Sequence, residues 1–434
     1  MLTPWRVRRA RAYVLAAIAA VLTGTVSSYL YRRPPPPAPD PAPVAEEVSQ
    51  QTRSFSLSKT LGENTLYTIT AEQVTNFENT GQALLRNVAV VIYGKDGSRR
   101  DRIASPECYY DPAASSIWIP GDVEMQFTIP QPGTMAGGAD APATAISIFT
   151  SRLSFEQSTG LASTDAPVRF VLPQGEGRSQ GAAYDPGKQI LTLKAGVSFQ
   201  FRGDAGAASA REPVVVHAGT AHLVRETGKA VLEHSVAVAR GPQRIRAARG
   251  EIALDAGRRV RQMTLAGGVA ATQETTNAFL QANAESGTLL LEPNGRMRSL
   301  TLKERVSWQM ARPGGGNRRE GAAQEVSLLF RDADGLLERL QAWREVRMSF
   351  HRGPEAAAGG GEQSLSGGAA ELFPAPGSNQ LQEATITGAP RLELLPRSAG
   401  AEQHTVTGDV FRIRLNESGE LSRFQASGNV RLVA

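Results

Sequence analysis

Residues 251–273 read EIALDAGRRVRQMTLAGGVAATQ, and this stretch decides the fold because its pattern returns along the chain. Two short runs of alternating apolar and polar residues flank a turn at residues 255–257. The pattern returns at residues 413–430 and 289–306, and looser copies end at Val346 and Pro390. The spacing of the closing points is roughly 30 to 45 residues, as expected when loops vary in length and strands do not.

Each copy predicts a β-hairpin. Leu300, Leu302 and Val306 share one parity while the residues between them are polar, which is the period of a strand with one buried face. The turns contain Asp, Asn and Gly, which tolerate or favour positive φ. A closing Gly-Val type of sequence also appears upstream, at residues 121–123, 196–197 and near Val236.

One segment has helical spacing instead. Leu337, Leu340 and Trp343 recur as on one face of a helix, in a run of good helix formers. Aligned on Val346, however, the segment falls on the second strand of a hairpin. We therefore predict a strand there, because packing in a sheet overrides local propensity.

The N-terminus has the composition of a membrane anchor. Four arginines within residues 1–11 precede an uncharged stretch at residues 12–31, which is long enough to span a bilayer. The arginines predict a cytoplasmic N-terminus. A cleavable signal peptide is the alternative, although its apolar region is usually shorter. Small residues recur at every fourth position and predict a surface for packing against another membrane helix, unless the alanine-rich composition produces them by chance: Ala16, Ala20, Gly24 and Ser28.

The anchor also explains the basic isoelectric point. All six basic residues of the first 33 positions flank the uncharged stretch, and the rest of the chain is close to neutral. No basic stripe with interleaved aromatic residues remains, so we expect no nucleic-acid partner. Residues 32–52 are rich in proline and predict an extended spacer.

The motifs that could indicate catalysis or metal binding are weak. Residues 177–181 match the G-x-S-x-G sequence of serine hydrolases, but Asp185-Pro186-Gly187 follows and prevents the required helix. His217 and His222 have opposite parity on a strand and cannot converge on a metal with His234. The single cysteine, Cys108, reads as a small buried strand residue. We predict no catalytic residues, no metal site and no cofactor.

Three stretches resemble the LptC family, the membrane-anchored periplasmic component of lipopolysaccharide export: residues 66–71, 84–97 and 117–123. The hairpins after about residue 215, with Leu265-Ala-Gly-Gly-Val269 and Phe424-Gln-Ala-Ser-Gly-Asn-Val430, resemble the OstA-like repeats of LptA and of the N-terminal part of LptD. The chain departs from LptC in size, since LptC is a single module. A fused bridge segment would explain the difference and puts in doubt the need for a separate LptA.

The resemblance implies an all-β fold of repeated hairpins, a folded-over β-jellyroll, after one transmembrane helix. The expected organisation is a cytoplasmic N-terminus (1–11), the transmembrane helix (12–31), the spacer (32–52), an LptC-like module (53–205) and an LptA/OstA-like module (206–434). The implied partners are lipopolysaccharide, inner-membrane ABC transporter subunits similar to LptB, LptF and LptG, and LptA-like or LptD-like β-jellyrolls docked edge to edge. The implied location is the inner membrane, with most of the chain in the periplasm.

The expected function is transfer of lipopolysaccharide along an apolar groove, without covalent chemistry. Candidate lining residues share the inward parity: Ile117, Ile119, Met125, Phe127, Phe199, Phe201, Met263, Leu265, Leu300 and Leu302. Each of them equally fits an ordinary packed core. Two alternatives stay open, an adaptor protein of the cell envelope with a solid β core and an extracytoplasmic enzyme with convergent carboxylates.

Overall fold

The computed structural model describes residues 48–433. It leaves out 62–63, 94–99, 129–144, 173–174, 202–212, 225–226, 255–259, 277–278, 293–295, 312–317, 332–334, 352–361, 377–379, 396–402 and 417–420. The expected anchor, its packing residues Ala16, Ala20, Gly24 and Ser28, and most of the spacer lie outside the described residues. Within the part of the chain that is described, no helix has the length and hydropathy of a membrane span.

The described residues form 25 strands. The first half of the array contains β1 (Val48–Leu61), β2 (Asn64–Phe77), β3 (Ala83–Tyr93), β4 (Arg100–Asp111), β5 (Ser116–Thr128), β6 (Ala145–Glu156), β7 (Ala162–Leu172), β8 (Gly175–Asp185), β9 (Ile190–Phe201), β10 (Val214–Ala218), β11 (Thr220–Val224), β12 (Lys229–Arg240) and β13 (Gln243–Leu254). The second half contains β14 (Val260–Glu274), β15 (Phe279–Leu291), β16 (Met297–Ala311), β17 (Arg318–Phe330), β18 (Leu337–His351), β19 (Glu362–Pro374), β20 (Leu381–Thr387), β21 (Arg391–Leu395), β22 (His404–Thr407), β23 (Val410–Leu415), β24 (Leu421–Ser427) and β25 (Arg431–Val433).

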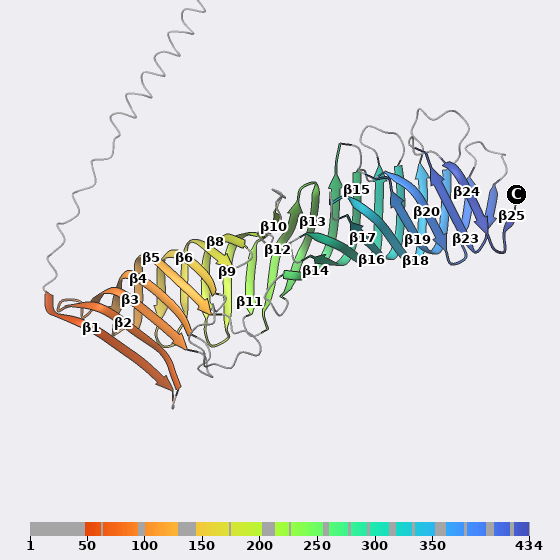
Figure 1. The fold of residues 1–434 in the computed structure, drawn as a ribbon. Helices are drawn as coiled ribbons and strands as arrows, with labels where there is room; N and C mark the ends of the chain where they lie inside the picture. Colours follow the sequence, from red (N-terminus) through yellow and green to blue (C-terminus); the bar gives the residue numbers. More distant parts are fainter. Residues whose placement is uncertain are drawn as a thin grey trace, which may run out of the picture.

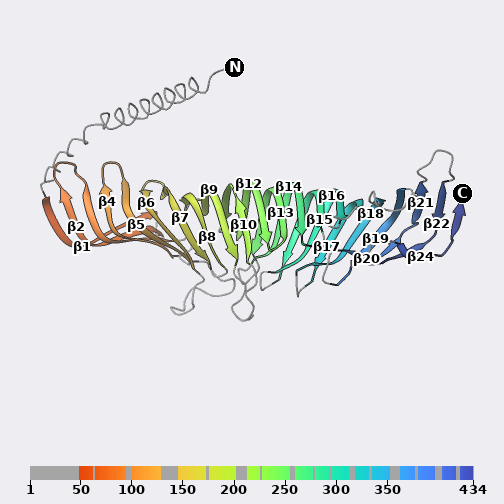
Figure 2. The ribbon, with the colours of Figure 1, turned by 90° about the horizontal axis from the view of Figure 1, so that it is seen from above.

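All strands belong to one antiparallel sheet, in which each hairpin pairs with the next. β9 pairs with both β10 and β11, and both pair with β12, so the sheet continues from one predicted module into the other. Near the C-terminus β19 pairs with β20 and β21, and the sheet ends with β24 on β23 and β25 on β22. Figures 1 and 2 show the resulting elongated array, with β1 and β25 at opposite ends.

Most strands bend near their middle, and from β12 onward left-handed residue pairs accompany every second bend. In β16 the register passes from Lys303 to Val306 while the partner strand β17 passes from Glu325 to Ala323, so Glu304 and Arg305 face a single residue. Both have positive φ, at 68° and 52°. Equivalent pairs of left-handed residues recur along the array: His234 and Ser235, Gly267 and Gly268, Arg344 and Glu345, Gly388 and Ala389, Gly428 and Asn429. A bulge of this kind bends a strand. The residues of the closing sequence of each repeat therefore form the bend.

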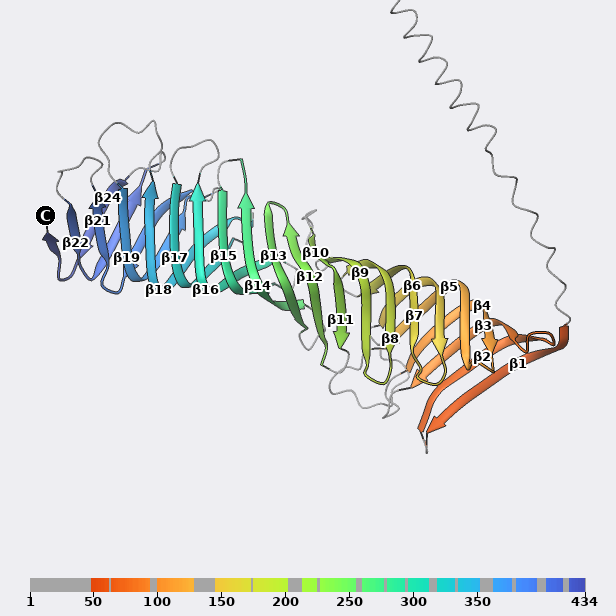
Figure 3. The ribbon, with the colours of Figure 1, turned by 180° about the vertical axis from the view of Figure 1, so that it is seen from behind.

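The bends fold the sheet into two walls (Figures 1 and 3). Wall A consists of the strand segments on one side of the bends, from residues 55–61 of β1 to β25. Wall B consists of the segments on the other side, from residues 48–53 of β1 to β24. The hairpin turns that the structure describes lie at the wall edges opposite the bends. We call the line where these two edges face each other the mouth.

Inward side chains of the two walls pack into one hydrophobic core that runs along the array. Tyr67 of wall A meets Phe155 of wall B edge to face, with ring centroids 5.7 Å apart. The strand prediction is confirmed for β18, where Leu340 and Ala342 are buried and Trp343 is on the outer face. Leu337 is buried as well, although it has the opposite parity, because the register shifts between Leu329 and Phe330 of the partner strand. The helical spacing of this segment is therefore overridden by the sheet, and the predicted all-β fold of repeated hairpins is correct.

Two of the predicted module boundaries can be compared with the positions of the strands. Strand β1 begins at Val48, so β-structure reaches into the end of the segment expected as a spacer. The expected boundary at residue 205 lies in a segment outside the described residues, between β9 and β10. Because β9 and β10 pair directly, both expected modules share one continuous sheet.

Candidate functional site

The core between the walls is the candidate functional site. The ten residues predicted to line a groove come from β5, β9, β14 and β16, and all point into it. Nine are buried and Phe199 is partly buried: Ile117, Ile119, Met125, Phe127, Phe201, Met263, Leu265, Leu300 and Leu302 are the buried nine. Their contact with a lipid stays a prediction, because a packed core places them identically.

Aromatic side chains fill the core in the N-terminal third of the array. Phe127 of wall A and Tyr184 of wall B pack edge to face at 4.8 Å, and Phe55 approaches Tyr110 across the walls at 6.5 Å. From β14 onward smaller inward residues alternate with leucine and methionine, among them the fully buried Ala282, Ala342 and Ala384.

The core is closed in this structure. Met263, Leu265, Leu300 and Leu302 have no exposed surface, so no water-sized space adjoins them. An acyl chain therefore needs the walls to separate before it can reach these side chains.

The mouth carries a partly exposed apolar edge. Phe199 stacks on Phe170 with ring centroids 5.8 Å apart and planes within 2°, and it meets Phe201 edge to face at 4.4 Å. Gly177 leaves room for the ring of Phe170, with which an added Cβ would collide. At Gly175 an added Cβ would collide with the carbonyl of Gln200 and come close to the ring of Phe199. Other partly buried apolar residues near strand ends continue this edge: Leu172, Leu223, Val260, Phe350 and Leu394.

Polar side chains at inward positions near the mouth were missed by the sequence reasoning. Asp101, Gln243 and Gln273 share the parity of the core residues beside them and are buried. A polar residue on the inward parity at the end of a strand is the signal that identifies them. Their partners lie on the opposite wall, which a single sequence does not place.

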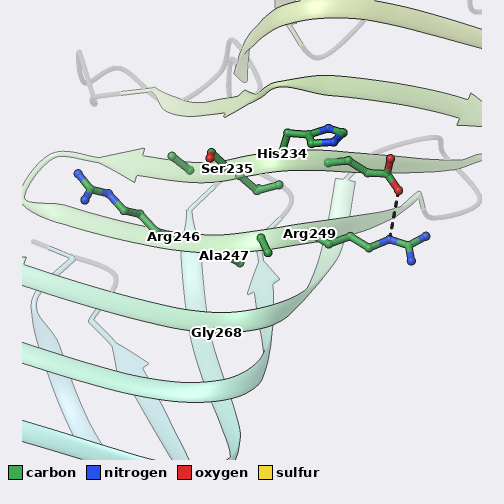
Figure 4. A pocket seen from close by; sticks show the side chains of 10 residues that line it. His234, Ser235, Arg246, Ala247, Arg249 and Gly268 are labelled. Carbon is green, nitrogen blue, oxygen red and sulfur yellow. Dashed lines mark ion pairs between the residues drawn. The ribbon is translucent and has the colours of Figure 1, made fainter.

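A crevice of about 850 Å³ lies on the outer surface at the bends of β12, β13 and β14. Figure 4 shows Arg246 and Arg249 pointing toward opposite ends of it, so the two guanidinium groups do not converge on a common point. Arg249 is paired with Glu233, at 3.8 Å from Nε to Oε1. The crevice is thus a depression at the bends that both polar and apolar residues line.

The other sequence motifs have structural roles. Ser179 of the G-x-S-x-G sequence lies within strand β8, where its hydroxyl donates to the carbonyl of Gly181 at 3.2 Å. His222 bonds to Thr192 and His234 to Thr220, each through Nδ1. Among the described residues, no three His, Cys, Asp or Glu side chains are grouped to hold a metal ion.

Cys108 lies in β4 with its side chain fully buried in the core. Burial raises the pKa of its thiol to about 12, because the thiolate loses its hydration. The thiol is therefore held in its protonated, unreactive form in the folded protein.

A folded-over antiparallel sheet that encloses an apolar core defines this protein as a β-jellyroll of the elongated, hairpin-repeat type. Residues 16–202 match the model of the LptC family, described as lipopolysaccharide-assembly, LptC-related. This match confirms the resemblance to the LptC family for the N-terminal part of the chain. The description of the family names an assembly process and no enzymatic activity.

No curated protein matches the chain. Among solved structures it is similar to the crystal structure of LptH from Pseudomonas aeruginosa, described as the LptA-homologous periplasmic component of the conserved lipopolysaccharide transport device. The two chains are 15% identical, and the similarity covers 31% of this chain and 83% of LptH with a TM-score of 0.24.

Proposed function

We propose that this protein is a membrane-anchored periplasmic component of lipopolysaccharide export. It accepts lipopolysaccharide from an inner-membrane ABC transporter at its LptC-related end. It then passes the acyl chains between walls A and B toward its C-terminal end. No covalent chemistry is involved, and the transporter supplies the energy.

The continuity of the apolar core is the observation that carries this proposal. The core extends from Tyr67 and Ile69 in β2 to Phe411 and Ile413 in β23, without leaving the single sheet. Each methylene group that leaves water for an apolar environment gains about 0.8 kcal/mol, so a lipid held between the walls avoids a large cost at every position. One continuous core thus supplies a path of nearly constant free energy.

Entry needs the walls to part at the mouth. The acyl chains would replace contacts between the two walls with contacts to lipid, which exchanges one apolar environment for another. The partly exposed ring of Phe199, which stacks on the buried Phe170, offers the first apolar contact at the mouth.

The ends of the array suit the partners that we propose. Among the described strands β1 pairs only with β2, and β24 and β25 pair only with β23 and β22. The C-terminal end also exposes apolar side chains, with Leu432 70% and Val433 61% exposed. A second β-jellyroll can add a strand to such an edge and cover these side chains. The residue 12–31 segment would hold the opposite end at the transporter.

An adaptor of the cell envelope is the second candidate. The closed core around Leu265 and Leu302 favours it, because a solid core needs no cargo. The two candidates differ in whether lipid ever reaches the core.

Site-specific photocrosslinking in membranes tests the proposal. A photoreactive residue replaces Leu265, which points inward, or its neighbour Thr264, which is exposed on the outer face. We expect lipopolysaccharide adducts at position 265 only, and only with ATP. A folded, anchored protein that gives no adduct at either position would support the adaptor instead.

A further inference from the structure

Hydrogen bonds between described residues join the two walls across the mouth in at least three places. In each of the three a side chain from the edge of one wall reaches the edge of the other wall, four or five strands along the array. We call these the cross-wall contacts. They are the contacts of Lys59 and Tyr67 with Gln157, of Asp101 with Tyr184, and of Gln243 and Gln273 with Gly335.

The third contact is the most complete. Gln243 begins β13 and Gln273 ends β14, so both lie at the mouth edge of wall A. Gly335 lies in the turn between β17 and β18, at the mouth edge of wall B. The Nε2 atoms of both glutamines donate to the Gly335 carbonyl, at 2.7 and 3.1 Å. The Gly335 N–H donates to the carbonyl of Arg331 at 3.0 Å.

The two contacts near the LptC-related end follow the same geometry. Lys59 Nζ and the Tyr67 hydroxyl, at the wall A edge of β1 and β2, donate to the carbonyl of Gln157 at 3.0 and 3.4 Å. Gln157 begins the turn between β6 and β7, on wall B. The Tyr184 hydroxyl of β8 donates to Oδ2 of Asp101 in β4 at 3.0 Å, and both groups are buried.

Polar contacts at these positions have a property that apolar packing lacks. When the walls separate, each donor and acceptor gains hydrogen bonds to water, so the contacts exchange at small net cost. When the walls close, burial without a hydrogen-bond partner would cost free energy, so each donor must pair again with its acceptor. This requirement fixes how the two edges align. A closure of this kind is reversible and has one closed register.

We propose that the cross-wall contacts are a reversible closure of the mouth, which must open before an acyl chain enters the core. This deepens the proposed function and rests on it for the identity of the cargo. The closure itself is a property of the fold and is measured without lipid.

Thiol labelling of a core residue measures the closure. Leu300→Cys places a reporter at a fully buried position in the full-length protein, and the parent chain gives the background from Cys108. The double substitution Gln243→Leu and Gln273→Leu removes the donors to Gly335, and Gln262→Leu, on the exposed face of β14, is the matched control. We expect the double variant to raise the labelling rate about tenfold and the control to leave it unchanged. Equal rates in the two variants would overturn the proposal.

A covalent lock provides the opposite perturbation, because the crosslink replaces the hydrogen bond from Gln243. Gln243→Cys and Leu336→Cys, on facing edges of the mouth, are joined by a short thiol crosslinker that a reductant cleaves. With a photoreactive residue at Leu265, the locked protein is expected to lose its lipopolysaccharide adducts and to regain them after cleavage. Adduct formation in the locked protein would contradict the closure. If the Leu double variant labels faster but no variant gives lipid adducts, the closure stands and the proposed function fails.

Discussion

Trp308 of β16 lies directly over Gly321 of β17, its cross-strand partner in wall A. A Cβ added at position 321 would collide with the indole ring of Trp308, which is almost fully buried. Gly321→Ala is therefore expected to lower the free energy of unfolding by about 1–3 kcal/mol through overpacking. The double variant Gly321→Ala with Trp308→Leu should lose less than the sum of the two single changes, measured by denaturant unfolding. Strict additivity would mean that the ring does not occupy this space.

Tyr184→Phe removes only the hydroxyl group that reaches Asp101 across the mouth. The carboxylate then keeps its buried position with one hydrogen bond fewer, so we expect a loss of about 1–3 kcal/mol in the free energy of unfolding. The native thiol of Cys108 should also be labelled faster, since it lies in the same part of the core. Tyr110→Phe serves as the comparison, because Tyr110 is only partly buried. Equal effects of the two changes would argue against a cross-wall role for Tyr184.

Backbone strain at the bends predicts opposite effects of two small substitutions. Gly268 has φ of 83°, and an added Cβ there meets no atom within 4 Å, so Gly268→Ala isolates the cost of the left-handed backbone. That cost is about 1–2 kcal/mol. Ser235 has φ of 62°, and Ser235→Gly relieves the same strain, with an expected effect between neutral and about 1 kcal/mol stabilising. Thermal unfolding measures the change in stability of each variant. Destabilisation by both substitutions would contradict a left-handed backbone strain at these bends.

The raised pKa of Cys108 predicts a pH dependence of stability. Its pKa is about 12 in the folded protein, above the ordinary value of 9.0, so the folded state retains the proton that the unfolded state releases between these values. The contribution of the thiol is therefore fully present below pH 9 and is lost as the pH rises toward 12. Cys108→Ala should unfold with a weaker alkaline dependence than the parent, by up to about 1.4 kcal/mol per pH unit. Identical alkaline profiles would show that the thiol titrates normally.

The strands and their buried faces could be predicted because a strand that is buried on one side has apolar residues at every second position. Leu300, Leu302 and Val306 kept their shared parity because the bend between them adds residues to the exposed face only. The closing sequence of each repeat was recognised in the sequence, but its role as the bend of the strand was not predicted. Its left-handed conformation was readable at Gly267 and Gly268, but not at Glu304 and Arg305, where the sheet imposes positive φ on ordinary side chains.

The closed state of the core and the cross-wall contacts could not be predicted. The partner of Gln243 is Gly335, and the offset of four strands between them depends on how the walls cross. That crossing is a tertiary property that no local pattern records. The anchor and its membrane partner stay predictions, because residues 12–31 lie outside the described residues.

The order in which lipid reaches the core tests the central claim most directly. Photoreactive residues at Ile119, Leu265 and Phe411 sample the core of β5, β14 and β23, and Thr264 and Arg412 provide outward controls. After ATP is added to membranes that contain the full export machinery, lipopolysaccharide adducts should appear first at 119, then at 265 and last at 411. The outward positions should stay free of adducts. Adducts that form at all five positions together, or without ATP, would contradict passage of lipid along the interior.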